Sequence, residues 1–162
     1  MRFLGLRKSD SPRIINISSA IHAWGKIDLQ DLQYTRRHYG PMKAYAQSKL
    51  LMNITTFELA RRLEALGIVV NCLHPGAVKT NLGMAEANNL FLKIFVKTLK
   101  CFFVTSQKAA AFPVLLANSS AFGAVSGKYF SKGKDVQASE LCYDQAFAKK
   151  LWEISTNMLN IA

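Results

Sequence analysis

Two short apolar runs on either side of one long helical segment constrain the fold most. Residues 13–19 form a β-branched run that ends in two serines, and residues 68–73 form a second apolar run. Between them, residues 42–66 carry apolar side chains at helical spacing, and Gly67 follows at a position where helices commonly end. A helix between two buried strands is typical of a parallel crossover. The sequence therefore predicts an α/β fold in which helices cover a parallel sheet.

The remainder of the chain predicts further elements of the same domain. We expect helices over residues 106–117 and 143–159, a short strand over 127–130, and a polar surface loop over 26–39. The 162 residues suit one domain, and 50% of them are hydrophobic, which argues against a disordered chain.

The chain is strongly basic. It has 21 Lys and Arg against 10 Asp and Glu, a formal net charge of +11, which favours anionic partners. The basic residues are scattered, and no nucleic-acid-binding motif accompanies them. We therefore expect a solvated basic surface and no specific binding of nucleic acid.

Cysteine and histidine spacing argues against a metal site. Cys72, Cys101 and Cys142 are odd in number and far apart, so we expect neither a disulfide framework nor a zinc site, and a reducing compartment. His22 and His74 have no acidic or cysteine neighbours at a ligand spacing, so we expect no metal. The chain opens without a secretory signal and has no apolar stretch of membrane-spanning length, so we expect a cytoplasmic protein.

A tyrosine and a lysine in the long helical segment are the first candidates for chemistry. Tyr45 and Lys49 are four residues apart, so their side chains share one face of the helix. An ammonium group close to a phenol stabilises the phenolate, and the pair can then act as a general acid/base near neutral pH. The spacing alone is weak evidence, because such pairs often lie on a wet helix face.

The ends of the two strands add to this pair. Ser18 and Ser19 end the first strand, and Pro75 and Gly76 follow the second, with Val78 and Thr80 close behind. Open parallel sheets bind ligands at the carboxyl ends of their strands. We therefore expect the serines, the helix of Tyr45 and the Pro-Gly turn to meet at one crevice.

In this combination the chain resembles the short-chain dehydrogenase/reductase family, and within it the retinol dehydrogenase-like branch. The family pieces, in order, are Asn16-Ile17-Ser18-Ser19, Tyr45-Ala46-Gln47-Ser48-Lys49 and His74-Pro75-Gly76 with Thr80. The branch is indicated by His22-x-x-Gly25-Lys26-Ile27, Asp31-Leu32-Gln33, Glu58-Leu59-Ala60-Arg61-Arg62-Leu63 and Ser126-Gly127-Lys128-Tyr129-Phe130. The resemblance covers nearly the whole chain from Pro12 onward.

The resemblance implies a dehydrogenase with a nicotinamide cofactor, NADP or NAD, acting on a small apolar alcohol or carbonyl compound. Tyr45 would exchange the proton with the substrate oxygen, and Lys49 would support it and bind the nicotinamide ribose. Ser19 would hold the substrate oxygen, with Ser18 as its structural neighbour. The cofactor would also meet the backbone at Pro75, Gly76 and Val78, and the side chain of Thr80.

One part of the family's pattern has no match. The family opens with a strand and a Gly-rich turn that binds the pyrophosphate, whereas Gly5 is the only glycine before Gly25 here. The resemblance therefore implies the C-terminal half of a Rossmann-type, doubly wound parallel sheet, with residues 1–162 forming one incomplete domain. The strand at residues 13–19 would then have a bare edge, which invites pairing with another chain. We expect the chain alone to be poorly stable and inactive unless the N-terminal half is supplied. Its expected partners are that half or a second copy of the chain.

Two interpretations of this gap stay open. The chain can be a truncated gene model or splice product of a full-length enzyme, which we favour. Alternatively, it is a stable half-domain or pseudoenzyme with a binding role.

Residues 88–104 are unusually apolar and coincide with the family's substrate-covering lid. An apolar substrate such as a retinoid or lipid aldehyde is one explanation, and an ordinary packed lid is another. A third is peripheral membrane contact through residues 90–103, since Lys93, Lys97 and Lys100 fall on one helical face. Separately, the resemblance implies that full-length relatives in this branch are membrane-associated at the endoplasmic reticulum, often through an N-terminal anchor.

Overall fold

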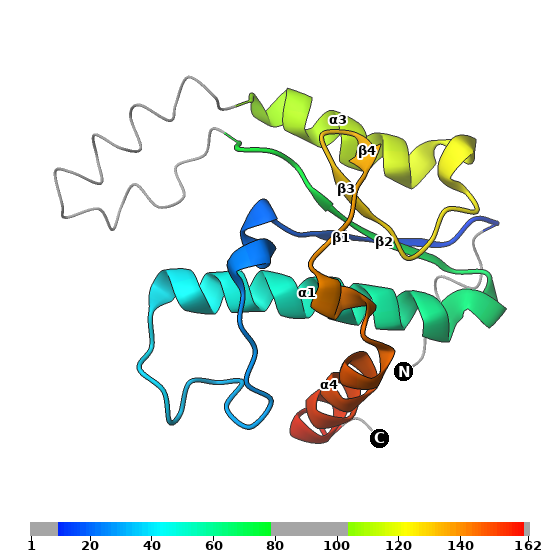
Figure 1. The fold of residues 1–162 in the computed structure, drawn as a ribbon. Helices are drawn as coiled ribbons and strands as arrows, with labels where there is room; N and C mark the ends of the chain where they lie inside the picture. Colours follow the sequence, from blue (N-terminus) through cyan, green and yellow to red (C-terminus); the bar gives the residue numbers. More distant parts are fainter. Residues whose placement is uncertain (1–9, 79–103, 161–162) are drawn as a thin grey trace, which may run out of the picture.

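The computed structural model describes residues 10–78 and 104–160, which form a four-stranded sheet between helices (Figure 1). Across the sheet the strand order is β1-β2-β3-β4; β1 pairs with β2 and β2 with β3 in parallel, and β3 with β4 antiparallel. The strands are β1 (Arg13–Ile17), β2 (Val69–His74), β3 (Tyr129–Ser131) and β4 (Lys134–Asp135). The helices are α1 (Pro41–Leu63), α3 (Ser106–Asn118) and α4 (Gln145–Met158), with 3-10 turns η2 (Ala20–Trp24), η3 (Glu64–Leu66), η5 (Ser120–Phe122) and η6 (Glu140–Tyr143).

The predicted parallel crossover β1-α1-β2 is confirmed. α1 begins at Pro41, in the first turn where its ring is tolerated, and Gly67 adopts a left-handed φ of 67° after the last turn, η3. β1 is shorter than predicted and ends at Ile17, so the two serines lie beyond it. The antiparallel strand β4 was not predicted.

Helices cover both faces of the sheet, as a doubly wound arrangement requires. α1 and α4 lie on one face and α3 on the other (Figure 1). Successive residues of β2 point to opposite faces: Cys72 joins a cluster with α1 and α4, whereas Leu73 joins a cluster with Leu116 of α3. The run of residues 68–73 is buried throughout because both faces are covered.

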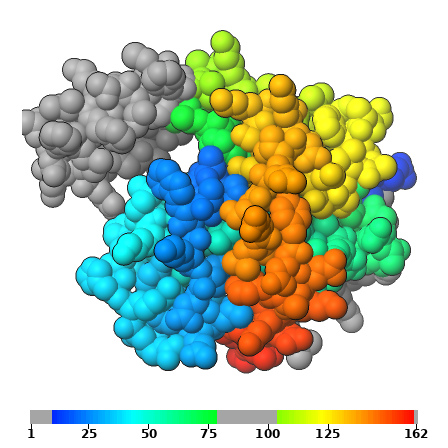
Figure 2. Space-filling model, in the orientation of Figure 1, coloured from blue at the N-terminus to red at the C-terminus, as the bar shows by residue number. Residues whose placement is uncertain are grey.

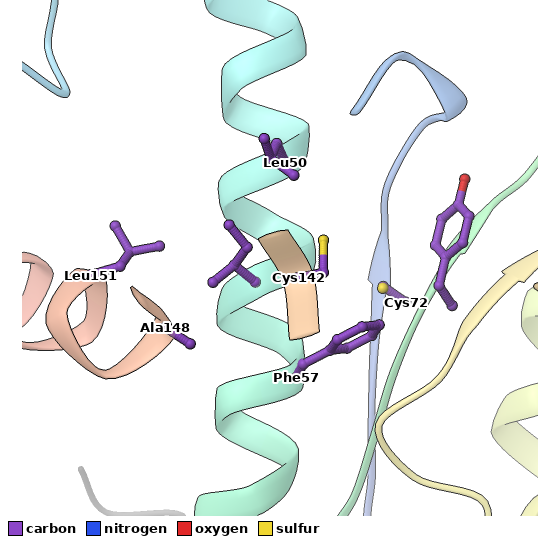
Figure 3. Packing of buried hydrophobic residues seen from close by; sticks show 8 residues of the cluster. Leu50, Phe57, Cys72, Cys142, Ala148 and Leu151 are labelled. Atoms are coloured by element: carbon purple, nitrogen blue, oxygen red, sulfur yellow. The ribbon is translucent and has the colours of Figure 1, made fainter. Parts of the chain in front are cut away.

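The core between α1 and α4 fixes the position of the long helix. Ile54 and Phe57 of α1, Cys72 of β2 and Leu151 of α4 are buried in one cluster (Figure 3). Burial raises the pKa of Cys72 and of Cys142 to about 12, so neither thiol is an anionic nucleophile at neutral pH. Both cysteines therefore serve as core residues.

Helix α3 is fixed to the opposite face by its two ends. The side chain of Thr105 caps its start by accepting a hydrogen bond from the backbone N–H of Lys108. The guanidinium of Arg13 in β1 donates to the carbonyl oxygens of Leu116 and Ser119 at 2.7 and 2.8 Å. A cation at the carbonyl end of a helix is favourable, so Arg13 ties β1 to α3.

One edge of the sheet is open in the described part of the chain. β1 pairs with β2 alone there, and Ile17 at its end is 45% exposed. An apolar strand with one unpaired side is the bare edge that the sequence predicts.

The polar stretch at residues 26–39 is more firmly anchored than a surface loop. The carboxylate of Asp31 is buried and accepts hydrogen bonds from Thr35 and from the backbone and guanidinium of Arg37. Arg37 also donates to the side chain of Gln47 in α1, which in turn donates to the backbone of Leu32. Figure 2 shows this blue-to-cyan segment packed beside the red α4, and the residues that line a shallow cavity there come from both.

Asp31 makes a testable contribution to acid stability. Burial opposes ionisation of Asp31, but hydrogen bonds from Thr35 and Arg37 outweigh it and hold the pKa well below its usual range. A depressed pKa in the folded state stabilises the fold above the unfolded-state value of about 4 and loses this contribution as pH falls further. We expect urea unfolding of Asp31→Asn to show less stability than the wild type at pH 6, and a smaller difference at pH 3. Glu153→Gln is the matched control, because Glu153 is exposed and forms no ion pair in the described part of the chain; an equal pH dependence for the two variants would contradict the assignment.

Among the described residues, no helix combines the length and apolar character needed to cross a bilayer. The predicted lid at residues 88–104 lies outside the described residues apart from Val104.

Candidate active site

The carboxyl end of β1 places the two serines. The backbone N–H of Ser18 still donates to Leu73 in β2, but the chain then leaves the sheet at Ser19. Ser19 begins the 3-10 turn η2, and its Oγ accepts a hydrogen bond from the N–H of Ile21 at 3.3 Å. The hydroxyl hydrogen of Ser19 is then available to another acceptor.

A glycine holds this turn against the helix. A Cβ at Gly25 would lie 2.7 Å from the carbonyl oxygen of Ala46 and 2.8 Å from the Cβ of Leu50. Only glycine allows η2 to approach α1 this closely. Gly25 therefore sets the distance between the serine segment and the helix that carries Tyr45.

Tyr45 and Lys49 share one face of α1 at the same end of β1. The Lys49 Nζ donates to the carbonyl oxygen of Ile17 at 3.0 Å and lies 5.7 Å from the centroid of the Tyr45 ring. Since Ser18 points its N–H toward β2, the preceding carbonyl of Ile17 points to the open edge of β1. The ammonium and the 45% exposed phenol ring therefore lie where the open edge meets the carboxyl end of the sheet.

The polar face of α1 continues from Tyr45 and Lys49 toward the carboxyl end of the helix. Asn16 of β1 donates to the hydroxyl of Thr56 at 2.8 Å, and Asn53 lies between Lys49 and Thr56 on the helix. Within the described part of the chain, neither the amide of Asn53 nor the Oγ of Ser18 has a hydrogen-bond partner, although both are buried. Buried polar groups are costly unless they form hydrogen bonds. This row of buried polar side chains therefore differs from an ordinary helix–sheet contact, which is apolar.

His22 also supports the serine segment, a role that sequence reasoning missed. It is buried, with its ring edge-on to Tyr129, and its Nε2 accepts a hydrogen bond from the backbone N–H of Ser139 at 3.3 Å. The proton is then on Nδ1, which donates to the carbonyl oxygen of Ser19 at 2.8 Å. No local signal reveals this contact, because Ser139 is far away in the sequence. His38, by contrast, is not buried, in keeping with its place in the polar segment.

The second strand ends at the same edge. Pro75 and Gly76 follow β2, and Gly76 has a φ of 89°, which a side chain would disfavour. Val78 forms an isolated parallel bridge with Val104, and Thr80 lies outside the described residues. Because β1 and β2 are parallel, the Pro-Gly turn and the Ser19 segment lie at adjacent strand ends.

This arrangement supports proton transfer. Residues 10–78 and 104–160 contain no group of three or more His, Cys, Asp or Glu side chains placed to hold a metal ion. The groups at this end of β1 are the phenol of Tyr45, the ammonium of Lys49 and the hydroxyl of Ser19, which can exchange a proton and hold an oxygen atom.

Curated proteins with similar sequences include retinol dehydrogenases. Human retinol dehydrogenase 14 is 39% identical over 160 residues, 98% of this chain and 47% of the relative. Human retinol dehydrogenase 13 is 36% identical over 159 residues, 96% of this chain and 48% of the relative. The chain thus spans about half the length of the curated relatives it matches. No protein-family model matches it.

Solved structures with the same fold agree. A doubly substituted form of a short-chain dehydrogenase/reductase from Serratia marcescens has a TM-score of 0.51 and is 27% identical, over 76% of this chain and 44% of that chain. A blue fluorescent protein from a metagenomic library, solved with NADPH, gives the same TM-score, identity and coverage. By sequence, the chain is a homologue of the retinol dehydrogenases, and by fold it is similar to short-chain dehydrogenase/reductases, in both cases over about half of their length.

Proposed function

We propose that the chain contributes the catalytic half of an NAD(P)-dependent oxidoreductase that interconverts an alcohol and a carbonyl compound. The observation that carries the proposal is the Lys49 ammonium held beside the Tyr45 ring at the carboxyl end of β1. Ser19 begins the adjacent turn at the same end. Relatives named retinol dehydrogenases support the same reaction class.

Each group has a distinct role in the proposal. Ser19 holds the substrate oxygen through its hydroxyl, and Tyr45 donates the proton to that oxygen in reduction or removes it in oxidation. Lys49 stabilises the phenolate form of Tyr45 by its positive charge. Ser18 supports Ser19 from its buried position. The nicotinamide, when bound, supplies or accepts the hydride.

The residues at the carboxyl ends of β1 and β2 fit the nicotinamide end of the cofactor. Lys49 offers an ammonium at the open edge of β1 to a ribose hydroxyl, and the backbone at Gly76 can be approached closely. Pro75, Val78 and Thr80 complete this side in the proposal. A neighbour solved with NADPH supports NADP, with NAD as the alternative.

The names of the relatives and the apolar composition of residues 88–104 support a proposal for the substrate. We propose a small apolar alcohol or aldehyde, such as a retinoid or lipid aldehyde, covered by residues 88–104. Peripheral membrane contact through residues 90–103 stays a prediction, because that segment lies outside the described residues.

We further propose that these 162 residues are inactive until the part of the fold that they do not span is supplied. The chain has no Gly-rich turn before β1 to bind the pyrophosphate, and β1 has a free side in the described part. The test supplies the part of human retinol dehydrogenase 14 that this chain does not match, as a separate polypeptide. Neither piece alone should oxidise NADPH with an aliphatic aldehyde, and the mixture should do so. Turnover by the chain alone would contradict the proposed division of the site.

The open edge of β1 also supports a second candidate, a half-domain that binds another chain without catalysis. An unpaired apolar strand edge is a template for strand addition. A stable complex of the two polypeptides that binds NADPH but never turns over would favour this role over the oxidoreductase.

A further inference from the structure

The carbonyl oxygen of Ser19 accepts two hydrogen bonds in the described part of the chain, and both come from His22. The backbone N–H of His22 lies 3.2 Å from this oxygen, and Nδ1 of its ring lies 2.8 Å from it. The backbone bond is the ordinary closure of a 3-10 turn, which any residue other than proline would make at this position. The second bond needs a side-chain donor, so the way in which Ser19 is held depends on the identity of residue 22.

The ring of His22 is fixed in its place. It is 4% exposed, and its centroid lies 4.7 Å from that of the Tyr129 ring in β3, at an interplanar angle of 66°. Aromatic pairs favour such edge-on arrangements. Nε2, the second ring nitrogen, accepts the backbone N–H of Ser139. A rotation of the ring would therefore break two hydrogen bonds at a buried position, which is costly.

The far end of this link is anchored to helix α1. Ser139 precedes the turn η6, and its carbonyl oxygen accepts the backbone N–H of Cys142 at 2.8 Å. Cys142 is buried in the cluster that contains Phe57 of α1, and the ring of Tyr143 lies 5.4 Å from the ring of Phe57, measured between centroids. Ser139 therefore has a defined position relative to the helix that carries the candidate acid/base.

We propose that His22 is a positioning residue, which directs the hydroxyl of Ser19 by linking it to the C-terminal segment on α1. The inference rests on the proposed function, in which Ser19 and Tyr45 share one substrate oxygen. The sheet guides the chain only as far as the N–H of Ser18, so Ser19 takes its orientation from the turn η2. Through His22, the hydroxyl from the end of β1 and the phenol of Tyr45 are both positioned by α1.

Two substitutions separate the two ends of the link. His22→Asn keeps a short amide donor for the carbonyl oxygen of Ser19 but has no acceptor that reaches Ser139. His22→Gln keeps a longer amide whose oxygen accepts the N–H of Ser139 but loses the donor to Ser19. Both variants lack the ring contact with Tyr129, so each is the matched control for the other.

Amide hydrogen exchange measures the orientation of Ser19 without turnover. The backbone N–H of Ile21 donates to Ser19 Oγ at 3.3 Å, so its exchange rate reports the position of that hydroxyl. By NMR of the isotope-labelled 162-residue chain, alone and mixed with the complementing half, His22→Gln should speed exchange at Ile21 about three- to tenfold and leave Ser139 unchanged. His22→Asn should speed exchange at Ser139 and leave Ile21 unchanged. Wild-type exchange at Ile21 in His22→Gln would overturn the proposal.

Turnover of the complemented protein separates a positioning role from a merely structural one. His22→Gln should lower kcat/KM for the aldehyde about three- to tenfold and leave the affinity for NADPH unchanged, because a misdirected hydroxyl holds the reacting oxygen less well. In a Ser19→Ala background the same substitution should have no further effect, since no hydroxyl remains to be placed. An equal loss in both backgrounds would overturn the positioning role and leave the proposed function intact. Absence of turnover in the wild-type mixture would instead contradict the proposed function, and the exchange rates at Ile21 and Ser139 would still decide the role of His22.

Discussion

Replacing Tyr45 by Phe should lower the turnover number of the complemented protein by about 10²- to 10⁴-fold, the usual contribution of a positioned general acid/base. The substitution removes only the phenolic oxygen, which in the proposed mechanism exchanges the proton with the substrate. The ring, the contact with Lys49 and the helix remain. Affinity for NADPH, measured by quenching of protein fluorescence, should therefore change little.

A second tyrosine provides the control for this experiment. Tyr39 lies just before α1 and is 59% exposed, so Tyr39→Phe should retain wild-type turnover. Loss of turnover in both variants would indicate that either substitution disturbs the start of α1, and not that Tyr45 has a specific role. Full turnover in Tyr45→Phe would remove the acid/base role from Tyr45.

Replacing Leu151 by Ala should lower the free energy of unfolding by about 2–5 kcal/mol. Leu151 is 1% exposed and packs in the cluster that joins α4 to α1, so the truncation leaves a cavity at that contact. Since small domains have only about 5–15 kcal/mol of stability, this loss would be a large share of the total. Urea unfolding followed by circular dichroism measures it.

Leu115 in α3 provides a matched control, because it is also a leucine in a helix but is 47% exposed. Leu115→Ala should cost less than about 1 kcal/mol, since Leu and Ala have similar helix propensities and little packing is lost. Equal losses at the two positions would mean that α4 does not depend on the Leu151 contact.

The fold could be predicted from features that are local in the sequence. The apolar runs at residues 13–19 and 68–73 and the glycine at position 67 predict the crossover, because each reflects a backbone or burial requirement that acts within a few residues. The structure differs at β1, which ends at Ile17, since Ser19 bonds to the turn that follows. The two-residue strand β4 is too short for an alternation pattern, so periodicity could not reveal it.

The candidate site was predictable only where its residues share an element. Helical spacing alone places Tyr45 and Lys49 on one face, and the distance of 5.7 Å from the Lys49 Nζ to the ring agrees with it. The supporting contacts join distant segments, such as His22 with Ser139, and no spacing rule reaches across them. The buried Asp31 looked like part of a polar loop, because a carboxylate that is satisfied by its own loop has the composition of a solvated one.

The central claim is that one substrate oxygen is shared by a phenol from α1 and a hydroxyl from the end of β1. A crystal structure of the complemented protein with NADP⁺ and an alcohol tests it most directly. The account predicts that the alcohol oxygen lies within hydrogen-bonding distance of both Tyr45 Oη and Ser19 Oγ, with Lys49 Nζ bonded to a ribose hydroxyl. An alcohol bound elsewhere, with Tyr45 and Ser19 contacting different ligands or solvent, would contradict it.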